Sequence, residues 1–118
     1  MRKVAVAGVG QLPFKAGYRD KSYLALAFEA TKKALNDAGL SPKDIDAVVY
    51  AIYSEPLLRQ GFPDIFIHDY LGMQGKTAVK VAAAESTGGH GLYAAFSQIA
   101  SGMADIVLLV AVQKVSDL

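Results

Sequence analysis

The chain has 118 residues, of which 53% are hydrophobic and 19% charged, a balance that suits one compact domain spanning 1–118 with enough apolar surface for a core. Its formal net charge is +1 and its basic residues are scattered, so the sequence offers no sustained field to attract nucleic acid or an anionic membrane. There is no cysteine, which excludes disulfides, thiolate metal sites and a cysteine nucleophile.

The first predicted element is a short strand over Lys3–Ala7, closed by glycine. Gly8 and Gly10 invite a dinucleotide-binding interpretation, but Pro13 stands in place of the third glycine and no helix follows at once, so a plain turn explains them better. The apolar run is too short for a signal peptide or a spanning helix, and we therefore expect a cytoplasmic protein.

A long amphipathic helix is predicted over Ser22–Ala38, because its apolar residues recur at three-four spacing and Gly39 follows as a C-terminal stop. A capping serine, a proline and a carboxylate predict a single helical turn at Ser41–Asp44. The continuous apolar run Ala47–Ile52 then predicts a buried strand.

The middle of the chain predicts a helix over Pro63–Leu71 that ends at Gly72, with three side chains inward: Ile65, Phe66 and Tyr70. Thr77–Ala82 is typical of a further strand.

The last predicted helix covers Thr87–Ser101 and stops at Gly102. One face of this predicted helix carries Leu92, Ala95, Phe96 and Ile99. The apolar run Asp105–Val112 predicts the fourth strand.

Strands that alternate with helices favour an α/β fold with a mainly parallel sheet and helices on both faces. The last predicted strand has no helix after it to cover it. We therefore expect further structure to follow or dock there.

Small residues crowd the predicted strand-to-helix junction, where backbone could approach a ligand closely. Glu85 precedes the helix, whose positive end favours an anion. The candidate substrate-binding residues beside it are Ser86, Thr87, Gly88, Gly89 and His90. Tight packing of the helix on the sheet would explain the small residues equally well.

Catalytic triads and metal sites find little support in the sequence. A serine-type triad built from Ser86 or Thr87 and His90 would lack an evident orienting carboxylate. N-capping explains both hydroxyls more simply. His68 and His90 lie on different predicted helices without cysteines, so no zinc site is expected.

Three segments are informative together: the opening Val4–Phe14, Asp44–Val48, and above all Val81–Asp117, with its strand, small-residue turn, helix and strand. Their residues, in this order, resemble archaeal and sterol-carrier-type thiolases. The resemblance covers the whole chain without obvious gaps. It implies the first part of a five-layered thiolase-type fold, a partial N-terminal domain with a dimer contact near Glu85.

In that family the turn before this helix carries a cysteine whose thiolate accepts the acyl group. Counting back from Gly102 gives Glu85 at the cysteine position, where a carboxylate cannot form the thioester. The family's catalytic histidine and second cysteine belong to a C-terminal half that this sequence does not contain.

The resemblance therefore implies the N-terminal part of an acyl-CoA acyltransferase of the acetyl-CoA acetyltransferase type, acting in lipid metabolism and inactive alone. Two alternatives stay open: a cysteine-less thiolase-like aldolase subunit, or a non-catalytic structural or CoA-binding subunit. We expect the completed protein to bind an acyl-CoA substrate. We also expect the chain to form a homo- or hetero-oligomer with a C-terminal thiolase half or a small partner protein. No cofactor is expected.

Overall fold

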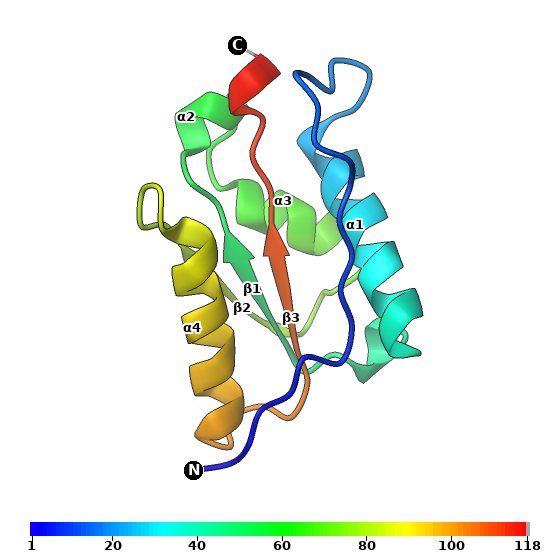
Figure 1. Cartoon of the computed structure of the whole chain (residues 1–118), viewed down its shortest axis with the longest axis vertical. Coiled ribbons are helices and arrows are strands. Elements are labelled where there is room, and N and C mark those ends of the chain that lie inside the picture. Colours follow the sequence, from blue (N-terminus) through cyan, green and yellow to red (C-terminus); the bar gives the residue numbers. More distant parts are fainter. Residues whose placement is uncertain (118) are drawn as a thin grey trace.

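The computed structural model describes residues 1–117, in which a parallel sheet separates two helical layers (Figure 1). Its strands are β1 (Ala47–Ala51), β2 (Thr77–Val81) and β3 (Val107–Ala111), and they lie in the order β2-β1-β3. Both pairings of β1 are parallel. The predicted α/β fold class with a parallel sheet is confirmed.

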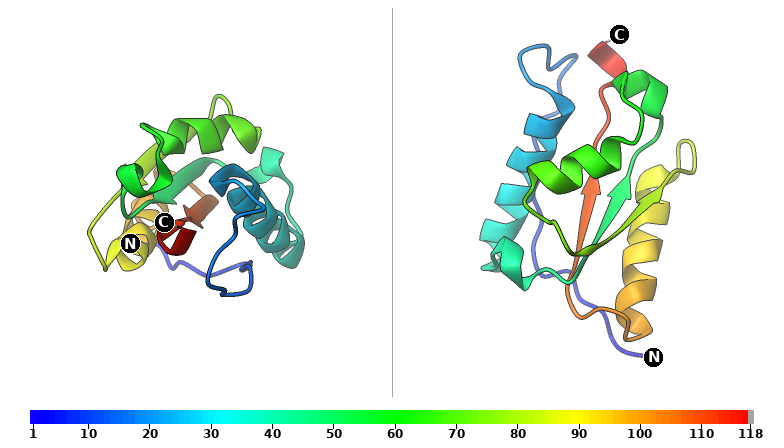
Figure 2. Two further views of the ribbon diagram at one scale, coloured as in Figure 1. Left: turned by 90° about the horizontal axis from the view of Figure 1, so that it is seen from above. Right: turned by 180° about the vertical axis from the view of Figure 1, so that it is seen from behind.

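Helices cover both faces of the sheet. Helix α1 (Tyr23–Ala38) and helix α3 (Pro63–Tyr70) lie on one face, and α4 (Thr87–Ala100) lies on the other (Figure 2). The shorter elements are the 3₁₀ turn η1 (Pro42–Asp44), helix α2 (Glu55–Leu58) and the 3₁₀ turn η2 (Val115–Asp117). The N-terminus and η2 lie at opposite ends of the molecule (Figure 1).

The ends of the first helical elements follow from their capping residues. The Ser22 hydroxyl accepts a hydrogen bond from the Ala25 N–H at 3.1 Å, and Gly39 ends α1 in the left-handed conformation. At η1, the Asp44 carboxylate accepts the Ser41 N–H at 2.8 Å. The predicted helix boundaries are confirmed here because they depend on contacts local in sequence.

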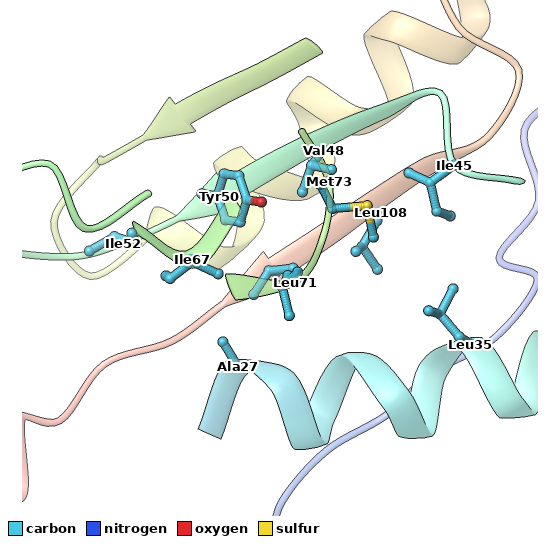
Figure 3. Packing of buried hydrophobic residues seen from close by; sticks show 11 residues of the cluster. Ala27, Leu35, Ile45, Val48, Tyr50, Ile52, Ile67, Leu71, Met73 and Leu108 are labelled. Carbon is cyan, nitrogen blue, oxygen red and sulfur yellow. The ribbon is translucent and has the colours of Figure 1, made fainter. Parts of the chain in front are cut away.

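The main core lies between the sheet and the α1–α3 layer. Every residue of β1 is buried, which explains why that strand is a continuous apolar run. Figure 3 shows Ala27 and Leu35 of α1 pointing toward this cluster. Its buried members are Ala27, Leu35, Ile45, Val48, Tyr50, Ile52, Ile67, Leu71, Met73, Leu108 and Val110.

The predicted inward face of α3 is wrong. Ile65, Phe66 and Tyr70 are 60%, 49% and 51% exposed, whereas Ile67 is fully buried. Helix α3 is short and apolar on more than one side, so its periodicity did not fix which side faces the sheet.

The apolar face that the sequence predicted for α4 is only partly buried. Ala95 is buried, but Leu92 and Phe96 are 57% and 40% exposed. The buried residues of α4 are small: Thr87, Gly91, Ala95 and Ala100. Small residues face the sheet because the helix backbone lies close to the strands.

The predicted strand at Lys3–Ala7 is also wrong, because it pairs with none of the strands in residues 1–117. The segment instead follows α1: a Cβ on Gly8 or Gly10 would lie 2.7 or 2.3 Å from α1 backbone carbonyls. These glycines therefore allow close packing of the segment on a helix. Apolar composition suited a strand, but a strand also needs a free edge in register.

Candidate functional site

The candidate site lies where β1 and β3 end and α4 begins. An open depression of about 560 Å³ occupies this edge of the sheet. Its lining residues are Ala51, Tyr53, Leu57, Ala84, Glu85, Thr87, Gly88, Ala111, Val112, Gln113 and Val115. Ligands in parallel α/β sheets bind at the carboxyl ends of the strands, so this is the expected edge for a site.

The turn before α4 has an unusual backbone conformation. Ala84 adopts a φ of 49°, in the left-handed region that an alanine rarely occupies. The Thr87 hydroxyl accepts a hydrogen bond from the Ala83 N–H at 2.9 Å and donates one to the Ala84 carbonyl at 2.6 Å. The Thr87 side chain therefore bridges the two residues that precede Glu85.

The N-capping role predicted for Ser86 and Thr87 is wrong. Ser86 is the N-cap residue, but its side chain makes no capping hydrogen bond and instead donates to the Ala83 carbonyl at 2.8 Å. Both hydroxyls hold the turn on the strand side of the helix.

Glu85 is exposed to solvent in the depression, just before the amide end of α4. Its Oε1 accepts a long hydrogen bond of 3.5 Å from the Tyr53 hydroxyl. The carboxylate faces open space, beside one proton donor and a positive helix end. This arrangement can orient a polar group of a ligand.

The Gln113 side chain is hydrogen-bonded to the backbone of Ser54, the residue that follows Tyr53. The Gln113 Oε1 accepts the Ser54 N–H at 3.1 Å, and its Nε2 donates to the Ser54 carbonyl at 3.2 Å. One amide side chain thus ties the end of β3 to the chain that leaves β1. Sequence reasoning missed Tyr53 and Gln113, although their positions directly after two buried strands could have indicated them.

The predicted substrate-binding residues separate into two groups. Thr87 and Gly88 line the depression together with Glu85. Ser86, Gly89 and His90 do not line it, and the His90 Nδ1 lies 3.1 Å from the Ser86 carbonyl. Substrate binding by these five residues stays a prediction.

Residues 1–117 contain no group of three His, Asp or Glu side chains arranged to hold a metal ion. Within the same residues, none of the helices has the length and apolar character needed to cross a membrane.

The family model and the curated relatives that match this chain agree with each other. Residues 4–118 match the family described as "Thiolase, N-terminal domain". The acetyl-CoA acetyltransferase of Methanothermobacter thermautotrophicus is 35% identical over 118 residues, which cover 99% of this chain and 30% of that protein. The chain thus spans about 30% of the length of this curated relative.

Solved structures give the same fold. The match to the 3-oxoacyl-[acyl-carrier-protein] synthase III of Aquifex aeolicus covers 79% of this chain and 30% of the synthase chain, with a TM-score of 0.69 and 30% identity. The match to the Ltp2–ChsH2(DUF35) aldolase covers 89% of this chain and 26% of the matched aldolase chain, with a TM-score of 0.70 and 27% identity.

Proposed function

The chain belongs to the thiolase family, as its N-terminal domain, and we propose that it forms part of an acyl-CoA site in which Glu85 replaces the nucleophilic cysteine. The observation that carries this proposal is the location of Glu85, which lies in an open depression at the amide end of α4. Its acyl-CoA substrate is proposed from acetyl-CoA acetyltransferase relatives.

The replacement changes what the site can do. Acyl transfer through an enzyme intermediate requires a thiolate that attacks the thioester carbonyl and displaces CoA. The chain has no cysteine, so we expect no acyl-enzyme from it and no acyl transfer by the 118-residue chain alone. A carboxylate at this position can instead act as a base or bind a polar substrate group.

An aldolase reaction is the second candidate, favoured by the likeness to the Ltp2–ChsH2(DUF35) aldolase. A base would remove the proton of a β-hydroxyl on an acyl-CoA, and the bond between the α- and β-carbons would break. The β-carbon leaves as a carbonyl compound, and the electron pair forms an enolate that is then protonated. We assign the role of base to Glu85, whose carboxylate is exposed in the depression.

A partner is part of the proposal. The solvent side of α4 carries Leu92, Tyr93 and Phe96, which are 57%, 71% and 40% exposed. An apolar helix face of this kind favours association. We propose that a C-terminal thiolase half or a small partner protein completes the site in an oligomer. From the proposed acyl-CoA substrate we further propose a role in lipid metabolism in the cytoplasm.

The test introduces the missing nucleophile. We expect Glu85→Cys in the protein purified from its own source, with every co-purifying chain, to gain the mass of one acetyl group on incubation with acetyl-CoA. Glu85→Ala, which has no nucleophile, is the matched control and gains nothing. An unmodified Glu85→Cys protein that is folded and binds acetyl-CoA would contradict the assignment of position 85.

The same preparation separates the alternatives. Release of a carbonyl product from a β-hydroxyacyl-CoA, lost in Glu85→Gln, supports the aldolase. Binding of CoA thioesters without turnover, in a complex with another chain, supports a non-catalytic subunit.

A further inference from the structure

The conformation of Ala84 requires a local restraint. A left-handed φ of 49° is unfavourable for an alanine, because its Cβ crowds the following carbonyl. Such a conformation persists only when surrounding contacts hold it. Glu85 is the next residue, so any relaxation of this turn moves its carboxylate.

The Thr87 hydroxyl supplies that restraint. It accepts the Ala83 N–H at 2.9 Å and donates to the Ala84 carbonyl at 2.6 Å, so one oxygen fixes peptide groups on both sides of the turn. Thr87 is only 5% exposed, and water therefore competes little for these bonds. The Ser86 hydroxyl adds one bond to the Ala83 carbonyl, but Ser86 is exposed.

Thr87 is itself fixed by the packing of α4 on the sheet. It lies one helical turn before Gly91, and both are buried on the sheet-facing side of α4. A Cβ on Gly91 would lie 2.8 Å from the Ala51 Cβ and 2.9 Å from the Leu109 Cδ1. The sheet thus fixes the helix, the helix fixes Thr87, and Thr87 fixes the turn.

We propose that Thr87 is a positioning residue whose hydroxyl holds the Ala83–Ala84 turn, so that the side chain at position 85 is presented at the amide end of α4. Its importance for a reaction rests on the proposed function. The positional effect does not, because it depends only on hydrogen bonds and packing within this chain and needs no substrate.

The absence of native cysteine allows a direct measurement. Glu85→Cys gives a single thiol, whose pKa depends on its position relative to the helix end. We would measure the pH dependence of its alkylation by iodoacetamide with Thr87, Thr87→Ser and Thr87→Val. Thr87→Ser keeps the hydroxyl, whereas Thr87→Val keeps the shape and removes it.

We expect Thr87→Val to raise the midpoint of alkylation by roughly half a pH unit, since the thiol then moves away from the helix end. Thr87→Ser should leave the midpoint unchanged. Thr31→Val is the matched control, because Thr31 is 6% exposed and its hydroxyl has no partner among residues 1–117. It should not move the midpoint either.

Equal midpoints for Thr87 and Thr87→Val, in proteins with the same circular dichroism, would overturn the proposal, and so would a shift in Thr87→Ser. Thr87→Ala replaces Thr87→Val if the latter does not fold, with the same two readings. Because alkylation needs no substrate, a shifted midpoint without acetyl transfer, in a Glu85→Cys protein that binds acetyl-CoA, would contradict the assignment of position 85 to the nucleophile and leave this role of Thr87 standing.

Discussion

Tyr50 is a polar residue at the centre of the most buried strand. Its hydroxyl lies 2.7 Å from the His68 Nδ1, and the His68 Nε2 lies 3.1 Å from the Lys76 carbonyl. Burial raises the pKa of Tyr50, so the phenol stays protonated and donates. The His68 Nδ1 then accepts, and the Nε2–H donates to Lys76. A buried phenol thus joins β1 to α3.

Removal of this hydroxyl should weaken the fold. We expect Tyr50→Phe to lower the free energy of unfolding by about 1–3 kcal/mol, because the His68 Nδ1 loses its partner inside the protein. Tyr70→Phe is the control: the ring is 51% exposed, and a change within about 0.5 kcal/mol is expected. Urea denaturation of both variants gives the comparison, and equal losses would argue against the bond.

At the scale of elements, Gly91 allows α4 to lie close to the sheet. A Cβ on Gly91 would lie 2.8 Å from the Ala51 Cβ of β1 and 2.9 Å from the Leu109 Cδ1 of β3, whereas a Cβ on Gly89 would have no atom within 4 Å. Two glycines of one helix therefore have different reasons to be there. Gly91 permits close approach, and nothing in residues 1–117 requires Gly89.

These two positions give a paired test. Gly91→Ala should lower the free energy of unfolding by about 1–3 kcal/mol, because the added methyl overlaps the strands. Gly89→Ala should raise it by up to about 1 kcal/mol, since alanine favours helix and meets no obstacle. Thermal unfolding followed by circular dichroism measures both, and a stabilised Gly91→Ala protein would contradict the packing of α4.

At the scale of the whole molecule, the end of the chain holds the loop before α1. The Lys114 ammonium donates to the Tyr18 carbonyl at 2.9 Å and to the Lys21 carbonyl, and it forms an ion pair with the Asp117 Oδ2 at 2.8 Å. Asp117 Oδ1 accepts the Tyr18 N–H at 2.8 Å. The bonds to Tyr18 and Lys21 connect residues that are more than 90 positions apart in the sequence.

This contact makes stability depend on pH. The hydrogen bond from Lys114, and then that from the Tyr18 N–H, hold the pKa of Asp117 below its ordinary value. Its contribution is therefore fully present above the ordinary pKa of an aspartate, and it is lost as the pH falls through the lowered value. We expect Asp117→Asn to reduce the loss of stability on acidification.

Denaturation by urea at several acidic pH values would measure this effect. Lys114→Met provides the matched background, because Asp117→Asn should then change the pH dependence less. An unchanged acid profile in Asp117→Asn would contradict a role for this carboxylate. Asp44 also has a lowered pKa, owing to Ser41, so some acid sensitivity should remain.

Much of the fold could be predicted from the sequence, because its signals are local. Ser22 and Gly39 mark the ends of α1, and Ser41 and Asp44 close a turn through contacts a few residues apart. The apolar run from Ala47 predicted a buried parallel strand, and the small residues around Glu85 indicated the strand-to-helix junction that lines the depression. Such features depend on the identity of neighbouring residues.

Only the tertiary structure decided which side of α3 and α4 faces the sheet, and whether Lys3–Ala7 pairs as a strand. The hydrophobic effect favours burial of apolar side chains but does not specify which side of a helix is buried. In α4 the small residues face the sheet, because a Cβ at Gly91 would already overlap the strands, and Phe96 lies on the exposed side. Tyr53 and Gln113 line the same depression as Glu85, although they follow β1 and β3 and are more than 25 residues away from it on either side. Their proximity arises from strand order, which no local pattern contains.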